Sequence, residues 1–252
     1  KEAKKIGNVH VAFDGSASKY DHCPTEEETD CVEHAAYLHY CSNNTIYGTS
    51  FASEPTSDSP VICDMSSDMF SRKIDWSKHD MVYAGAQKNL GPSGTVLVVI
   101  RKSLLERCPD TLPLMLNYNA LASKDSRLNT PPTFGIYLMG QVFKWILSNG
   151  GLEEMQQHNE RKASLIYKAL DDCSDFYTVF ARECSRSQMN IPFKTKSDEL
   201  DALFLEESAK QGMSGLKGHR DLGGLRASIY NAFPESGCVQ FAEFLHSFVA
   251  AH

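Results

Sequence analysis

Short apolar runs separated by polar turns characterise the first half of the chain. They lie at residues 36–41, 61–63, 81–84 and 94–100, and the last is rich in β-branched residues. Apolar runs that do not alternate with polar positions are typical of strands covered on both faces, as in an α/β sheet. The pattern therefore predicts a mainly parallel sheet flanked by helices.

Helical spacing dominates the second half. A polar loop with two consecutive prolines introduces a helix over about 135–148, and apolar positions recur at helical intervals over 152–172. We place a domain boundary near residue 155, so that residues 1–155 belong to a large domain and residues 156–252 form a small α+β domain. Within this small domain the pattern predicts strands at 176–180, 189–193 and 227–230, and helices at 198–212 and 236–250.

Composition narrows the class of protein. The 252 residues include 42% hydrophobic and 23% charged residues, which is ordinary for a soluble globular chain. A net charge of -7 gives no basic surface for nucleic acid, and no apolar run approaches the roughly 20 residues of a membrane helix. The eight cysteines are scattered without a C-x-x-C pair. This pattern favours free thiols in a reducing, cytoplasmic compartment over disulfides or a zinc site.

Lys88 is the first candidate for chemistry. It follows the run at 81–84 closely and stands between the amides Gln87 and Asn89. A lysine at the tip of a buried strand can lose hydration, which lowers its pKa and suits it to Schiff-base formation with a carbonyl cofactor. The alternative is a surface lysine, which is the usual place for this residue type.

Two further polar residues follow predicted strands. Asp64 ends the run at 61–63 and Thr45 comes after the run at 36–41. Ligands of an open α/β sheet bind beyond the carboxyl ends of its strands, so both side chains can converge with Lys88. A carboxylate paired with a protonated ring nitrogen, beside a lysine Schiff base, is the binding pattern of pyridoxal 5'-phosphate. Asp64 could instead cap a turn, and Thr45 alone is uninformative.

The small domain holds a second group of candidates. Arg220 and Arg226 lie six residues apart with His219 and several glycines beside them. The planar guanidinium binds carboxylate or phosphate through two parallel hydrogen bonds, so this segment is a candidate anion site. The alternative is a solvated basic loop that precedes a strand.

Several stretches match one known family in its own order, from about residue 36 to the carboxyl end. The chain resembles the phosphoserine aminotransferases, which are class V, pyridoxal-phosphate-dependent enzymes of the aspartate-aminotransferase fold. The matching stretches are His39-Tyr-Cys-Ser-Asn-Asn-Thr-Ile-Tyr-Gly48, Cys63-Asp-Met-Ser-Ser-Asp68, Tyr83-Ala-Gly-Ala-Gln-Lys-Asn-Leu-Gly-Pro92, Asn129-Thr-Pro-Pro-Thr133, Arg186-Ser-Gln-Met-Asn-Ile-Pro-Phe193, Leu216-Lys-Gly-His-Arg220 and Arg226-Ala-Ser-Ile-Tyr-Asn-Ala232.

The resemblance implies a role for each residue around the cofactor. Lys88 would bind the cofactor covalently and act as the catalytic base. Asp64 would keep the pyridine nitrogen protonated, Thr45 would hydrogen-bond the phenolic oxygen of the ring, and Gln87 would contact the cofactor phosphate.

The resemblance also implies a shared site and a substrate. Asn129 and Thr130 would reach the cofactor phosphate of a second subunit, so we expect a homodimer. Arg226 would bind the α-carboxylate of the substrate, and His219 and Arg220 would lie near its distal anionic group. The implied reaction transfers an amino group between glutamate and 3-phosphohydroxypyruvate, giving O-phosphoserine and 2-oxoglutarate.

The resemblance is incomplete at the amino end. The family's chains carry a substantial N-terminal section that we expect this chain to lack, so the large domain would be partial. One alternative is a non-catalytic or incomplete fragment that assembles with a full-length subunit or with a separate N-terminal part. Another is a related pyridoxal-phosphate enzyme such as a desulfurase.

Overall fold

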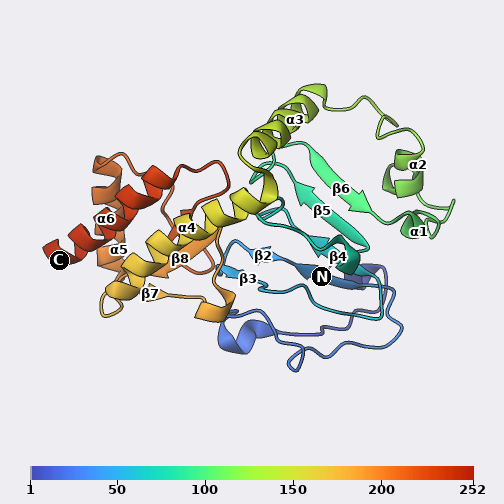
Figure 1. Ribbon diagram of the computed structural model, residues 1–252. Helices are drawn as coiled ribbons and strands as arrows, with labels where there is room; N and C mark the ends of the chain where they lie inside the picture. Colours follow the sequence, from blue (N-terminus) through green and yellow to red (C-terminus); the bar gives the residue numbers. More distant parts are fainter. Residues whose placement is uncertain (1) are drawn as a thin grey trace.

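A four-stranded sheet forms the centre of the first half of the chain. The computed structural model describes residues 2–252, and its main sheet has the order β1-β4-β5-β6 (Figure 1). The strands are β1 (Leu38–Cys41), β4 (Val61–Asp64), β5 (Met81–Gly85) and β6 (Val96–Ile100). The first three are parallel, and β6 runs antiparallel to β5. The prediction of an α/β fold with a mainly parallel sheet is confirmed.

The last strand of this sheet departs from the expectation. β6 is an edge strand, and Val96 and Val99 are 62% and 39% exposed. The prediction that its apolar run is covered on both faces is wrong for residues 2–252, because no element among them covers these two side chains. Strand pairing with β5 and partial burial are enough to select β-branched residues at this edge.

Shorter elements connect the strands. Two small strands, β2 (Asn43–Asn44) and β3 (Thr49–Ser50), pair in an antiparallel hairpin directly after β1. The remaining short elements are the 3₁₀ helices η1 (Ala3–Lys5), η2 (Gly15–Ser18), η3 (Trp76–Lys78), η4 (Leu114–Leu116) and η5 (Glu183–Ser185), and the helices α1 (Lys102–Leu105) and α2 (Tyr118–Ala122).

Two long helices lead from the first half to the second. α3 (Thr133–Ser148) lies beside the main sheet, and α4 (Gly151–Asp172) runs from there to the carboxyl-terminal part (Figure 1). Between them Gly150 and Gly151 have φ values of 92° and 75°, a left-handed conformation that favours glycine. Both predicted helices are confirmed, and the glycine pair explains the sharp change of direction.

A second, antiparallel sheet organises the carboxyl-terminal part. Its order is β7 (Thr178–Val179), β8 (Asn190–Lys194) and β9 (Leu225–Ser228). Two helices complete it, α5 (Asp198–Lys210) and α6 (Glu235–Ala251). These elements confirm the predicted α+β order of the tail.

Two of the predicted strand positions need correction. The predicted strand at 176–180 is reduced to the two residues of β7, because only Thr178 and Val179 pair with β8. β9 begins two residues earlier than predicted, since Leu225 pairs with Phe193 and Arg226 with Pro192. Arg226 therefore lies inside a paired strand, whose hydrogen bonds fix its backbone.

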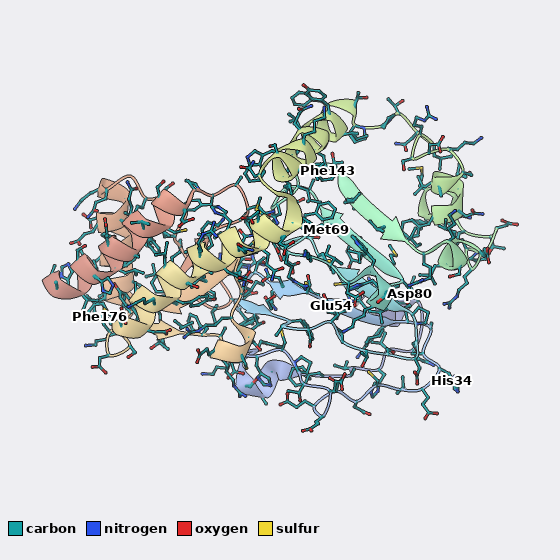
Figure 2. All side chains as sticks on the ribbon, in the orientation of Figure 1. His34, Glu54, Met69, Asp80, Phe143 and Phe176 are labelled. Carbon is teal, nitrogen blue, oxygen red and sulfur yellow. The ribbon has the colours of Figure 1, made fainter. Side chains whose placement is uncertain are left out.

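Two apolar clusters form the cores. The first lies between the main sheet and α3, and the second lies between α4, α6 and the small sheet. Figure 2 labels Met69 and Phe143 from the first region and Phe176 from the second. The predicted boundary at residue 155 falls within α4 and stays a prediction. Within residues 2–252 no helix is long and apolar enough to span a membrane.

Candidate active site

The carboxyl ends of three parallel strands bring the main candidates to one edge of the sheet. Asp64 is the last residue of β4, and its neighbours in register are Cys41 on β1 and Tyr83 on β5. Lys88 lies in the turn after β5, and Thr45 lies in the hairpin that follows β1. The edge of the sheet therefore presents an amine, a carboxylate and a hydroxyl from consecutive neighbouring segments.

The turn after β4 is tied to the end of β5. The Asp64 carboxylate accepts a hydrogen bond from the backbone N–H of Ser66 through Oδ1, at 2.9 Å. The Ser66 hydroxyl oxygen in turn accepts the N–H of Gly85 at 3.0 Å. Asp64 therefore caps the turn that follows β4, as the alternative prediction from the sequence expected.

The charges of Asp64 and Lys88 act on groups at the strand ends. Desolvation raises the pKa of Tyr83 to about 12, and the negative charge of Asp64 adds to the increase. Desolvation by the surrounding chain also raises the pKa of the Cys41 thiol to about 11; Asp64 increases it further, and the positive charge of Lys88 opposes it. The Cys41 thiol therefore lies within the field of both the carboxylate and the amine.

Arg226 reaches this edge from the small sheet. Its Nη1 donates a hydrogen bond to the backbone carbonyl of Thr45 at 3.0 Å, across 181 positions of sequence. Its Nε is buried and has no hydrogen-bond partner among residues 2–252. A buried N–H without an acceptor costs free energy, so the guanidinium keeps one unsatisfied donor among residues 2–252. The structure thus brings together Arg226 and Thr45, which the sequence placed in separate groups.

The hairpin that carries Thr45 is held by a close backbone contact. Gly48 has φ 72°, and a Cβ on it would lie 2.2 Å from Cδ of Pro192 on β8. Beside it, Nδ2 of the buried Asn43 donates to Asn190 Oδ1 at 3.0 Å and to Ser67 Oγ at 2.8 Å. Sequence reasoning missed this buried polar network. Both asparagines lie in the quoted motifs, but only the fold shows which partners they have.

Three predicted cofactor contacts lie on exposed segments. Gln87 is exposed beside Lys88, and Asn129 and Thr130 are exposed in the loop before α3. Asn129 Nδ2 donates to the carbonyl of Thr130 at 3.4 Å, and no hydrogen bond among residues 2–252 joins either residue to Lys88 or Asp64. Their predicted contacts with a cofactor phosphate stay predictions.

His219 and Arg220 lie at the tip of a tight loop that leads into β9. The Arg220 side chain is 91% exposed, and His219 Nδ1 accepts the N–H of Asp221 at 3.3 Å. The base of the loop closes tightly, because a Cβ on Gly218 would lie 1.9 Å from the carbonyl oxygen of Gly223. This loop is continuous with the strand of Arg226 but makes no hydrogen bond to the sheet edge within residues 2–252.

Comparison with known proteins identifies the class. Residues 3–240 match the family model described as aminotransferase class-V, and the chain belongs to this family. A phosphoserine aminotransferase of Desulfotalea psychrophila is 48% identical over 250 residues, covering 99% of this chain and 69% of the relative. The protein therefore belongs to the pyridoxal-phosphate-dependent transaminases.

Solved structures of phosphoserine aminotransferases are also similar to this chain. The phosphoserine aminotransferase from Bacillus circulans subsp. alkalophilus has a TM-score of 0.97 at 48% identity, covering 99% of this chain and 70% of that one. The phosphoserine aminotransferase from Trichomonas vaginalis, solved with pyridoxal phosphate bound, has a TM-score of 0.92 at 34% identity; the match covers 97% of this chain and 70% of that one. The predicted family is confirmed.

Proposed function

We propose that this chain catalyses the phosphoserine aminotransferase reaction. It transfers the amino group of glutamate to 3-phosphohydroxypyruvate, giving 2-oxoglutarate and O-phosphoserine, a step of serine biosynthesis. The proposal is carried by the position of Lys88 and Asp64 after neighbouring strands at the carboxyl edge of the main sheet, together with the bond from Arg226 to Thr45 in the hairpin that follows β1. The relatives named for this activity support the substrate pair.

The residues at this edge fit pyridoxal phosphate. Lys88 supplies an amine for the aldehyde and Asp64 supplies a carboxylate for a protonated ring nitrogen, and both follow neighbouring strands at the same edge of the main sheet. Thr45 and Gln87 would contribute a hydroxyl and an amide to the ring oxygen and the phosphate. When bound, the cofactor supplies an electron-accepting ring conjugated to the substrate nitrogen.

The chain's own residues would then divide the work. Arg226 would hold the substrate α-carboxylate through its guanidinium, whose planar donors suit a carboxylate. Lys88 Nζ, released when the amino donor takes its place, would act as the general base that removes the proton from the substrate α-carbon. Asp64 would pair its carboxylate with the ring nitrogen of the cofactor and keep that nitrogen protonated. The same three groups would serve the keto acid in the reverse direction, so we expect ping-pong kinetics.

The distal anionic group of the substrate would meet the loop at the base of β9. His219 and Arg220 would lie near it, since their loop leads directly to Arg226. Arg220 has ample freedom to move toward an anion because its side chain is almost fully exposed. A doubly anionic substrate would thus be held at both ends by one continuous segment.

We also propose a homodimer in the cytoplasm. Asn129 and Thr130 would contact the cofactor phosphate of the second subunit. Their loop lies between exposed apolar side chains, which indicate a surface that is covered in an assembly. These side chains are Leu112, Leu114, Met115, Leu116 and Tyr118 before the loop, and Phe134, Ile136 and Tyr137 after it. All eight cysteines are free, which supports a reducing compartment.

An isotope experiment tests the function. The protein expressed from its complete gene is incubated with pyridoxal phosphate, 3-phosphohydroxypyruvate and glutamate labelled with ¹⁵N at the amino group. We expect ¹⁵N in O-phosphoserine and none when Lys88 is replaced by alanine. Folded, cofactor-loaded protein that yields no labelled phosphoserine contradicts the proposal. In a parallel incubation with cysteine, release of alanine would indicate the desulfurase alternative.

The fragment alternative has its own comparison. The 252-residue chain and the product of the complete gene are assayed side by side at equal concentration. Equal activity contradicts the alternative, and activity of the gene product alone supports it.

A further inference from the structure

A lysine on α4 is fully buried and is bound only by backbone carbonyl groups. Lys162 is 0% exposed, and its Nζ lies 2.8 Å from the carbonyl oxygen of Tyr230, 3.1 Å from that of Ile229, 3.2 Å from that of Phe233 and 3.4 Å from that of Asn231. No ion pair within residues 2–252 involves this ammonium. Its three N–H groups are thus shared among four acceptors of one short segment.

The segment that it holds connects the two halves of the proposed site. It begins directly after β9, the strand of Arg226. The N–H of Asn231 donates to Asn89 Oδ1 at 2.9 Å, and Asn89 is the residue after Lys88. Asn159, also on α4, donates to Asn231 Oδ1 at 2.8 Å. One buried network therefore joins α4, the end of β9 and the turn of the catalytic lysine.

Burial of the Lys162 charge costs free energy in the folded state. Burial lowers the pKa of Lys162 to about 8, below its ordinary value of 10.5. The charged form is therefore disfavoured in the folded state, and this cost is relieved only as the pH rises above about 8. An apolar side chain of similar volume would avoid the cost, but it would leave the carbonyl groups without donors.

We propose that Lys162 is a positioning residue, whose ammonium gathers the carbonyl groups after β9 and holds Arg226 in register with Lys88. The inference rests on the proposed function, because this register has a catalytic consequence only if Arg226 binds the substrate carboxylate. This role could not be predicted from the pattern of residues, since a lysine on an amphipathic helix is ordinarily solvated.

Substitution of the ammonium tests the role. Lys162→Met keeps most of the side-chain volume and removes the donors, and Lys168→Met on the same helix removes an exposed lysine that pairs with Asp172 at 2.7 Å. For Lys162→Met we expect the KM for glutamate to rise about tenfold or more, with the absorbance of the cofactor-loaded protein retained. The Lys168→Met control keeps both values. A role confined to folding would lower the amount of active protein at an unchanged KM, and that result overturns the inference.

A measurement on the unaltered protein covers the case in which Lys162→Met does not fold. Hydrogen exchange is followed at about pH 7 and about pH 9.5, on either side of the pKa of Lys162. The other titratable or charged groups that act on Lys162 or His158 are Arg161 on α4 and Glu235 and Cys238 on α6. Desolvation lowers the pKa of His158 and raises that of Cys238 to about 11, so neither changes charge over this range.

The expected result is local. Protection factors of the amides that follow β9 rise at the higher pH, while those of α5 stay constant, because opening of the segment hydrates Lys162 and restores its ordinary pKa, so the closed state gains stability as the pH rises through about 8. Equal protection of the segment at both pH values overturns the inference. Absence of cofactor absorbance in the unaltered protein would instead refute the proposed function, and the exchange result would still decide whether the ammonium holds the segment.

Discussion

Replacing Arg226 with lysine keeps the positive charge and removes the planar donor pair. In the structure, Nη1 is already bound to the carbonyl of Thr45, and Nε is a buried donor with no partner in residues 2–252. A substrate carboxylate would accept hydrogen bonds from two of the guanidinium N–H groups that the Thr45 carbonyl leaves free. Lysine places one ammonium at the end of a flexible stem, so the bidentate contact is lost.

The size of the effect follows from the lost donor. A hydrogen bond to a charged group contributes about 1.5–3 kcal/mol. Since about 1.4 kcal/mol corresponds to a factor of ten, kcat/KM for glutamate should fall by roughly 10- to 150-fold. The value for 3-phosphohydroxypyruvate should fall by a similar factor, because its carboxylate would occupy the same position.

Steady-state kinetics with both substrates measures this change. The matched control is Arg182→Lys, since Arg182 is half exposed and pairs with Asp21 at 2.9 Å away from the strand ends. The control should keep kcat/KM within about twofold, as expected for a surface ion pair. A loss of less than threefold in Arg226→Lys, or an equal loss in the control, refutes the assignment of the carboxylate site.

Three further predictions concern the cofactor, the fold and the pH. Lys88→Ala should abolish the absorbance near about 410–430 nm that we expect when pyridoxal phosphate is added to the protein, and a band that persists contradicts the role of Lys88. Gly48→Ala should lower the free energy of unfolding by more than about 2 kcal/mol in urea titrations, because the new Cβ would meet Pro192 at 2.2 Å with φ 72°; an unchanged midpoint refutes the contact. Burial raises the pKa of Asp68 to about 6, so its protonated form stabilises the fold below about pH 4 and that contribution is lost as the pH rises through 6. Asp68→Asn should therefore gain up to about 3 kcal/mol in stability relative to the unaltered protein between about pH 4 and pH 7, and a constant difference argues against a buried charge.

The elements of the fold were predictable because their signals are local. Apolar runs located the four strands of the main sheet, and helical spacing located α3, α4, α5 and α6. β9 was misplaced by two residues because its register is set by pairing with β8 and by the bridge from Lys217 to Leu225. Such long-range pairing leaves no mark on local hydrophobicity.

The candidate site was predictable only in part for the same reason. The positions of Asp64 and Lys88 followed from one rule, that ligands bind beyond the carboxyl ends of parallel strands. The contact between Arg226 and Thr45 joins two sheets and could not be read from spacing. The burial of Lys162 was hidden as well, since its acceptors are backbone carbonyl groups, which every residue carries.

The most direct test of the central claim is to locate the covalent bond to the cofactor. The protein expressed from its complete gene is loaded with pyridoxal phosphate, reduced with borohydride so that a lysine–cofactor bond becomes a stable amine, and digested for peptide mass spectrometry. The account predicts the cofactor's mass on the peptide that contains Lys88 and on no other lysine peptide. An unmodified Lys88 in loaded, reduced protein, or the mass on a different lysine, would contradict it.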